Sequence, residues 1–190
     1  MRPSRIAFAG ALFLAAMTGG ASAQSAAERL TIELKDGPVV IELRPDVAPK
    51  HVERIKALAA AGEYDNVAFH RVIEGFMAQT GDVQYGDMED GFQPQAAGTG
   101  GSSQPDLPAE FSEVPFERGT VGMARSQDPN SANSQFFIMF APGDFLNGQY
   151  TVVGKVVEGM DNVDKIKRGD EASNGAVAEP DRMIKVTAGE

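Results

Sequence analysis

The chain has 190 residues, with 17 basic and 27 acidic side chains, a formal net charge of −10 at pH 7, two histidines and no cysteine. This acidity argues against a nucleic-acid partner, because proteins that bind a phosphate backbone need clustered Lys and Arg. The lack of cysteine excludes disulfides and thiolate chemistry, and two histidines supply too few ligands for a His-rich metal centre, so we predict no metal site.

The first residues have the pattern of a secretory signal peptide. Arg2 and Arg5 form a positive start, residues 6–17 are an apolar run, and Ala21-Ser22-Ala23 is typical of a cleavage site. The apolar run is too short for a spanning helix and no later stretch could span a bilayer, so we expect no stable membrane insertion after cleavage. A membrane-anchored N-terminus is the alternative. We therefore predict a signal peptide at residues 1–23 and one domain at residues 24–190, with a formal charge of about −12 once the two arginines are removed.

Eight short apolar segments predict strands, and turn residues lie between most of them. The first two, residues 30–34 and 39–43, are separated by Lys35-Asp36-Gly37-Pro38. Asp-Gly between two such runs indicates a hairpin, because glycine accepts the positive φ of a tight turn. The other six candidates are residues 68–73, 76–81, 120–124, 135–140, 151–157 and 183–187.

Two segments have helical periodicity instead. In residues 46–61, apolar side chains recur at helical spacing, Asp46 is placed to cap the helix and Pro49 falls in its first turn. A weaker pattern runs from Met160 to Ile166 and ends in Lys167, Arg168 and Gly169. Eight strands with two helices favour a mainly β fold, which we predict as a closed eight-stranded antiparallel β-barrel capped by two α-helices. From pattern alone a β-sandwich is the alternative.

Residues 84–108 predict a long loop, and three motifs in the chain suggest chemistry that their context does not support. Gly98–Ser103 lacks the lysine and the preceding strand of a phosphate-binding loop. Ser126 or Ser134 could belong to a hydrolase triad, but no Gly-x-Ser-x-Gly turn is present. Asp87, Glu89 and Asp90 lack the spacing of a calcium-binding loop and indicate a solvated face.

One segment, residues 67–82, mixes polar and apolar side chains, so the strand face on which each one lies has to be considered. As a strand it would place Phe69, Arg71 and Ile73 on one face and His70 on the other. Taken alone, such an arginine is more typical of an ion-paired edge or a snorkelling side chain than of a catalyst.

The order of motifs along the chain resembles the cyclophilin family. Phe69-His70-Arg71 followed by Gly75-Phe76-Met77-Ala78-Gln79 matches that family's signature. The glycine loop of the family is matched by residues 98–101, its second block by residues 123–125 and 134–138, and its third block by residues 145–148 and 153–156. The resemblance covers essentially the whole predicted mature chain, in order.

This resemblance implies a peptidyl-prolyl cis/trans isomerase that rotates X-Pro bonds in unfolded or flexible polypeptides, without a cofactor or a covalent intermediate. Arg71 would be catalytic by donating a hydrogen bond to the proline nitrogen of the twisted amide, and Gln79 would orient Arg71 or the substrate carbonyl. His70 would be a structural neighbour. The resemblance implies the following substrate-binding residues: Phe76, Met77, Ala124, Arg125, Ser126, Phe137, Phe145, Leu146 and Tyr150.

The chain departs from the family pattern at three of these positions. Many members have Trp at the position of Phe145, His at that of Tyr150 and Asn at that of Arg125. Phe145 keeps an apolar wall but lacks an indole N–H, so we expect weakened affinity for cyclosporin-type inhibitors. These features and the signal peptide indicate a Gram-negative periplasm and a role in the folding of exported proteins. A proline-binding holdase and a purely structural β-domain are the alternatives.

Overall fold

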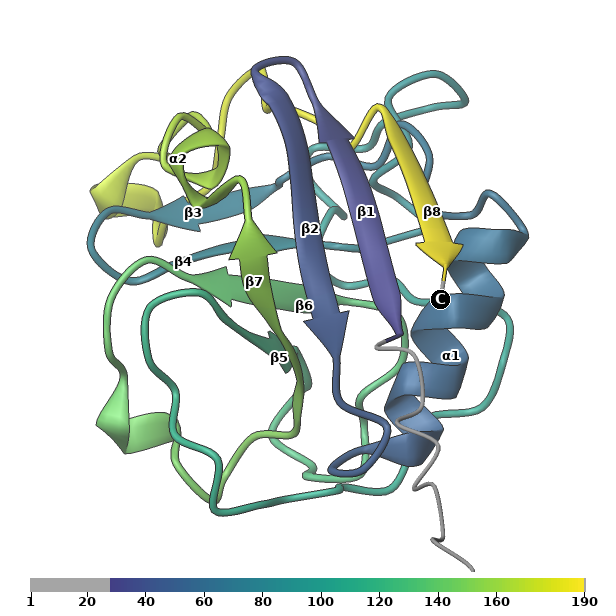
Figure 1. Ribbon diagram of the computed structural model, residues 1–190. Coiled ribbons are helices and arrows are strands. Elements are labelled where there is room, and N and C mark those ends of the chain that lie inside the picture. The colour runs from purple at the N-terminus through teal and green to yellow at the C-terminus, as the bar shows by residue number, and fades with distance from the viewer. Residues whose placement is uncertain (1–27, 190) are drawn as a thin grey trace, which may run out of the picture.

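An eight-stranded antiparallel sheet forms the body of the protein (Figure 1). The computed structural model describes residues 28–189, so the predicted signal peptide lies outside the described residues. The order across the sheet is β3-β4-β6-β5-β7-β2-β1-β8. The strands are β1 (Arg29–Leu34), β2 (Gly37–Leu43), β3 (Arg71–Ile73), β4 (Met77–Thr80), β5 (Thr120–Met123), β6 (Phe136–Met139), β7 (Val152–Glu158) and β8 (Lys185–Gly189).

The β1–β2 hairpin confirms the prediction made from Asp36-Gly37. The two strands pair antiparallel from Arg29 and Glu42 to Leu34 and Gly37. Gly37 has φ 130°, a conformation that residues with a side chain avoid.

The prediction of a closed barrel is wrong, because the sheet curls but stays open. Strands β3 and β8 are its two edges, and no ladder joins them. An isolated bridge between Ala68 and Arg182, with three backbone hydrogen bonds around it, joins the segments that precede these strands. The free edge of β3 is occupied by residues 169–177 instead: the backbone N of Val72 donates to the carbonyl O of Gly175 at 2.8 Å, and N of Gly169 donates to O of Val72 at 2.8 Å. Because this segment satisfies the edge of β3, β8 does not pair there.

Helix α1 (Pro49–Ala60) lies beside β8, and its buried side chains include Val52, Ile55 and Leu58 (Figure 1). The prediction that Asp46 caps this helix is wrong. The residue before the helix is Ala48, and no side chain at that position accepts a hydrogen bond from the helix. Asp46 instead accepts hydrogen bonds from Arg44 at 2.7 and 2.8 Å. A carboxylate from a distant loop, described below, satisfies the first helical amides.

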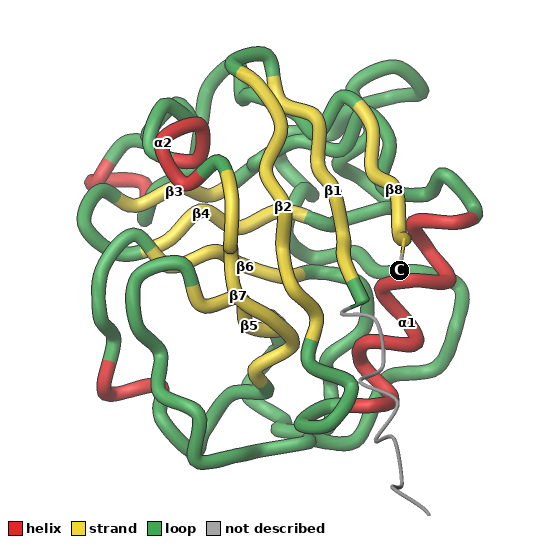
Figure 2. Tube along the Cα trace, in the orientation of Figure 1, coloured by secondary structure: helices red, strands yellow, loops and turns green. Residues whose placement is uncertain are grey.

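The second predicted helix is much shorter than its periodicity suggested. Helix α2 (Met160–Val163) has four residues; residues 164–165 form a turn, 166 is a bend and 167–169 are irregular. Two 3-10 helices complete the elements, η1 (Asp144–Leu146) and η2 (Glu171–Ser173). Between β4 and β5 the chain contains no helix or ladder-forming strand, so most of the protein outside the sheet is loop (Figure 2). Within residues 28–189, no helix is long and apolar enough to cross a membrane.

The apolar interior is divided into two clusters. The larger one joins the faces of β1, β2, β6 and α1, where Ile32, Ile41, Ile55 and Ile138 are each at most 1 % exposed. The smaller one lies beneath one face of β4 and β6 and has half-buried residues packed against it, among them Phe76, Ala124 and Tyr150. Its buried members are Met77, Phe116, Phe137, Met139, Leu146 and Val152.

Candidate active site

A cavity of about 440 Å³ opens over the smaller apolar cluster. Every site residue nominated from the sequence lines it except Ser126, and Gln149 is a lining residue that the sequence did not indicate. The lining residues are Arg71, Phe76, Met77, Gln79, Ala124, Arg125, Phe137, Phe145, Leu146, Gln149 and Tyr150.

The register of three neighbouring strands brings the central residues together. Arg71 on β3 pairs with Gln79 on β4, and Gln79 pairs with Phe137 on β6. Successive side chains of a strand point to opposite faces, so Met77 and Gln79 face the cavity while Ala78 joins the main core.

Phe136 and Phe137 lie on opposite faces of β6. Phe136 is fully buried in the main core, where its ring meets that of Tyr64 edge-on at 5.6 Å. Phe137 forms the floor of the cavity and stacks on Phe116 with 5.7 Å between ring centroids.

The guanidinium of Arg71 is held on two sides. Its Nη1 donates to Oε1 of Gln79 at 3.2 Å, while Nε and Nη2 donate to the carbonyl O and to Oδ1 of Asn174 at 3.0 and 3.1 Å. Burial lowers the pKa of Arg71 from its ordinary value, and a guanidinium stays charged at any ordinary pH despite such a change. Nη1 also lies 3.9 Å from Sδ of Met77, a weak acceptor, so of five N–H groups three are held by oxygens, one by the thioether, and one on Nη2 has no partner among residues 28–189.

A chain of amides supports Gln79 from behind. Nε2 of Gln79 donates to Oε1 of Gln135 at 3.0 Å, and Nε2 of Gln135 donates to the carbonyl O of Gly100 at 2.8 Å. Because each amide uses its nitrogen to donate, the oxygen of Gln79 is directed to Arg71. Gln135 was not nominated from the sequence.

Apolar side chains form the remaining walls. Met77, Phe137 and Leu146 are at most 6 % exposed, whereas Phe145 is 65 % exposed at the rim, 5.5 Å from the ring of Phe76. Tyr150 meets Phe137 edge-on at 6.0 Å. A concave apolar floor with the fixed cation of Arg71 at its side suits a small apolar ring attached to a polar amide.

Arg125 lies at the boundary between this cavity and an adjoining one of about 390 Å³. Its guanidinium lies 4.4 Å above the ring of Tyr150 and donates to the carbonyl oxygens of Ser126 and Gln149 at 2.8 and 2.9 Å. Ser126 lines the adjoining cavity, and its hydroxyl lies 2.7 Å from that of Ser131.

A buried carboxylate organises the long loop at residues 83–97. Asp82 is fully buried and accepts hydrogen bonds from the backbone N of Gln84, Tyr85, Gly98 and Gly100, at 2.7–3.1 Å. Four backbone donors replace the water that a carboxylate would lose on burial. Gly98 and Gly100 then line the adjoining cavity.

His70 lies behind the site and has no hydrogen-bond partner at either ring nitrogen among the described residues. Burial lowers its pKa, with the nearby charge of Asp82 acting in the opposite direction. It does not line the cavity that holds Arg71 and the aromatic walls.

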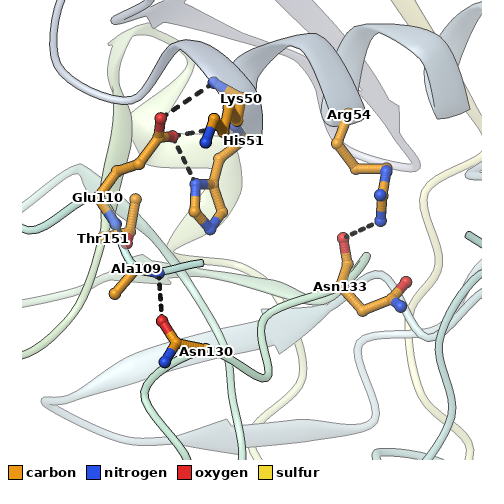
Figure 3. Close-up of polar contacts among 8 residues, drawn as sticks. All are labelled: Lys50, His51, Arg54, Ala109, Glu110, Asn130, Asn133 and Thr151. Carbon is orange, nitrogen blue, oxygen red and sulfur yellow. Dashed lines mark hydrogen bonds and ion pairs between the residues drawn. The ribbon is translucent and has the colours of Figure 1, made fainter. Parts of the chain in front are cut away.

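Helix α1 anchors the loops that carry the outer part of the site (Figure 3). Glu110 accepts from the backbone N of Lys50 and His51 at 3.3 and 3.2 Å and from Nδ1 of His51 at 2.7 Å, so it caps the helix from 60 residues away. Arg54 donates to the carbonyl oxygens of Pro105 and Asn133 at 2.8 and 3.4 Å. Asn133 in turn lines the adjoining cavity.

No group of three His, Asp or Glu side chains that could hold a metal ion is present in residues 28–189. The site is an apolar cup lined by the guanidinium groups of Arg71 and Arg125 and the amides of Gln79 and Gln149. Such an arrangement can bind a peptide and hydrogen-bond its amide groups.

Comparison with known proteins agrees with this fold and site. A family model described as cyclophilin type peptidyl-prolyl cis-trans isomerase/CLD matches residues 29–188. A probable peptidyl-prolyl cis-trans isomerase of Brucella suis is 65 % identical over 186 residues, covering 96 % of this chain and 95 % of its own. Peptidyl-prolyl cis-trans isomerase B of Escherichia coli is 38 % identical over 146 residues, covering 73 % of this chain and 83 % of its own.

Among solved structures, a cyclophilin type isomerase of Cryptosporidium parvum in the presence of the dipeptide Ala-Pro superposes with a TM-score of 0.71 at 28 % identity, covering 85 % of this chain and 99 % of its own. The chain therefore belongs to the cyclophilin family. It is a peptidyl-prolyl cis-trans isomerase, acting on proline-containing peptides.

Proposed function

We propose that Arg71 carries the isomerase chemistry, by hydrogen bonding to the proline nitrogen as the X-Pro bond twists. Amide resonance gives a rotation barrier of about 20 kcal/mol, and resonance is lost in the twisted state. The nitrogen then regains a lone pair, which accepts a hydrogen bond that the planar amide accepts poorly. An interaction that is stronger in the transition state than in the ground state accelerates the reaction.

The observation that carries this proposal is the fixed Arg71 guanidinium beside the apolar cup. Its three oxygen contacts, to Gln79 and twice to Asn174, leave for a substrate one N–H on Nη2 and one N–H on Nη1 that is held only by the weak thioether acceptor of Met77. Met77, Phe137 and Leu146 provide a dry surface for a proline ring. With the ring held there, the residue before proline can rotate while Arg71 stays in place.

The remaining nominated residues would bind the peptide around this centre. Gln79 would position Arg71, and Phe76, Phe145 and Tyr150 would enclose the ring and its neighbours. Ala124, Arg125 and Ser126 run from the first cavity into the adjoining one, which supports a role in binding the peptide on either side of the proline. No step requires a cofactor or a covalent intermediate.

We further propose that the enzyme assists the folding of exported proteins in the periplasm of a Gram-negative bacterium. The support is the sequence pattern of residues 1–23, with its positive start, apolar run and Ala21-Ser22-Ala23. Uncatalysed X-Pro isomerisation takes tens of seconds or longer and can limit folding. Unfolded or flexible segments with exposed X-Pro bonds would be its substrates.

The test expresses the full chain with its own first 23 residues in a Gram-negative host and fractionates the cells. We expect the protein in the periplasmic fraction with Gln24 as its first residue. The purified product should accelerate the proline-limited refolding phase of a test protein. Uncleaved protein that stays in the cytoplasm would contradict the location, and an unchanged refolding phase would contradict the folding role.

A further inference from the structure

The segment 169–177 covers the free edge of β3, and Asn174 within it contacts the Arg71 side chain. Besides the two contacts of Val72, the backbone N of Val177 donates to O of His70 at 3.1 Å. Two consecutive residues of the segment, Asn174 and Gly175, have φ values of 53° and 81°. A side chain at Gly175 would place its Cβ 2.5 Å from Cγ1 of Ile73, so this tight turn depends on glycine.

This turn directs two oxygens of one residue toward one edge of the guanidinium. The carbonyl O of Asn174 accepts from Nε of Arg71 at 3.0 Å, and its Oδ1 accepts from Nη2 at 3.1 Å. Nε and Nη2 lie on the same edge of the guanidinium, so the two bonds fix the plane of the group as well as its position. Asn tolerates the left-handed conformation better than most residues with a side chain, which allows both oxygens to be presented together.

All three oxygen acceptors of Arg71 are neutral. They are two oxygens of Asn174 and Oε1 of Gln79, and Arg71 forms no ion pair with any of residues 28–189. A carboxylate in place of the Asn174 amide would hold the same edge but would also offset the positive charge. Neutral acceptors orient the guanidinium and leave its charge for the substrate.

We propose that Asn174 is a positioning residue of the isomerase, which fixes the Arg71 guanidinium so that the N–H groups not held by oxygen acceptors stay available to a substrate in the cavity. This inference rests on the proposed role of Arg71. Because Asn174 is exposed, water competes for Nη2 once the Oδ1 acceptor is removed. Loss of Oδ1 therefore loosens the guanidinium rather than unfolding the site.

The test uses Asn174→Gly, which accepts the same backbone conformation, keeps the carbonyl O and removes the side chain, whose Oδ1 is the atom that accepts from Nη2 of Arg71. We expect kcat on a proline peptide to fall about fivefold, with KM changed less than about twofold, because orientation matters most in the transition state. Asn174→Asp keeps an acceptor but adds a negative charge, and we expect a similar or larger loss of kcat. Wild-type kcat in Asn174→Gly would overturn the proposal.

The matched control is Asn66→Gly, because Asn66 also has a left-handed backbone, with φ 63°, but lines none of the cavities around Arg71. It should leave kcat unchanged. In an Arg71→Lys background, where the guanidinium edge is absent, Asn174→Gly should change kcat less than about twofold. An equal loss in both backgrounds would mean a structural role and would contradict the proposal.

A measurement independent of activity completes the test. Nitrogen-15 NMR of the arginine side chains should show slow rotation of the Arg71 guanidinium about Cζ–Nε in the wild type and faster rotation in Asn174→Gly. Unchanged rotation would overturn the inference whatever the kinetics show. If Arg71→Lys alone keeps the wild-type rate, the proposed role of Arg71 fails, and this outcome is distinct from a failure of Asn174.

Discussion

Arg71 and Gln79 face each other on adjacent strands, and Nη1 of Arg71 donates to Oε1 of Gln79 across 3.2 Å. The pairing places the cation on the edge strand β3 and its amide partner on β4, next to the apolar floor. A guanidinium on an edge strand would ordinarily turn toward water. Here Gln79 on one side and Asn174 on the other keep it at the cavity.

Replacement of Arg71 by Ala removes the proposed hydrogen bond to the proline nitrogen. We expect kcat/KM on a proline peptide to fall by about tenfold or more, since each ~1.4 kcal/mol of lost transition-state stabilisation is a factor of ten. Arg71 is only half-buried, so the variant should fold, which circular dichroism and thermal unfolding can check. A coupled peptide assay measures the rate.

The control for this variant is Arg44→Ala, because Arg44 pairs with Asp46 outside the cavity around Arg71. It removes the same charge and should keep the wild-type rate. Near-normal activity in Arg71→Ala would end the proposed mechanism. Client protection that survives in Arg71→Ala while isomerisation is lost would instead favour the holdase alternative.

Gln135 is predicted to act on the rate through Gln79. Its Oε1 accepts from Gln79 and its Nε2 donates to O of Gly100. Gln135→Leu removes both of these hydrogen bonds and keeps a side chain of similar volume. Gln79 could then turn away from Arg71, and we expect kcat to fall about threefold to tenfold. Gln84→Leu is the control, because that amide donates to Tyr85 in an exposed loop. Equal rates for the two variants would show that the hydrogen bonds of Gln135 are not needed for isomerisation.

The sequence predicted those parts of the fold and site that local patterns determine. Asp36-Gly37 predicted the first hairpin because the turn needs a residue that accepts positive φ. The period of two along a strand places adjacent residues on opposite faces, which accounts for Phe136 in the core and Phe137 at the cavity. Which of the two faces the cavity came from the family resemblance alone.

The parts that could not be predicted depend on contacts between distant residues. Glu110 caps α1 from 60 residues away, whereas the local pattern indicates the nearer Asp46. The Asn174-Gly175 dipeptide indicates a left-handed turn, but nothing in the pattern locates it beside Arg71, 103 residues earlier. The prediction of a closed barrel is wrong for the same reason, because residues 169–177 cover the edge of β3 that closure would have required.

The two histidines predict that the folded state loses stability in mild acid. Burial lowers the pKa of His51 below 6.5, against the opposing effect of Glu110, and burial likewise lowers the pKa of His70. The unfolded chain therefore binds more protons than the folded chain as the pH falls through 6.5, so the free energy of unfolding decreases. The slope is at most about 1.4 kcal/mol per pH unit for each histidine.

Glu110 adds to the same trend at lower pH. Burial alone would raise its pKa, but the hydrogen bonds from the side chain and backbone of His51 and from Lys50 outweigh it and lower the pKa below 4.5. Its contribution is present above 4.5 and is lost as the pH falls through the folded-state value. Urea unfolding from about pH 8 to about pH 4 measures both effects. His51→Asn should flatten the upper part of the curve, and an unchanged slope would contradict this assignment.

Phe145 is predicted to limit the affinity for cyclosporin-type inhibitors. Its ring is 65 % exposed at the rim and packs 5.5 Å from Phe76, but it carries no donor. Phe145→Trp keeps an aromatic wall and adds an indole N–H, so we expect cyclosporin to inhibit about tenfold more tightly, as one added hydrogen bond and a larger apolar surface allow. The turnover of a proline peptide should change less than about threefold, because the floor made by Met77 and Phe137 is untouched.

Phe111→Trp, which adds the same indole at an exposed position outside that cavity, should leave inhibition unchanged. Equal inhibition of wild type and Phe145→Trp would show that other departures, such as Arg125 stacked 4.4 Å above Tyr150, decide the affinity instead.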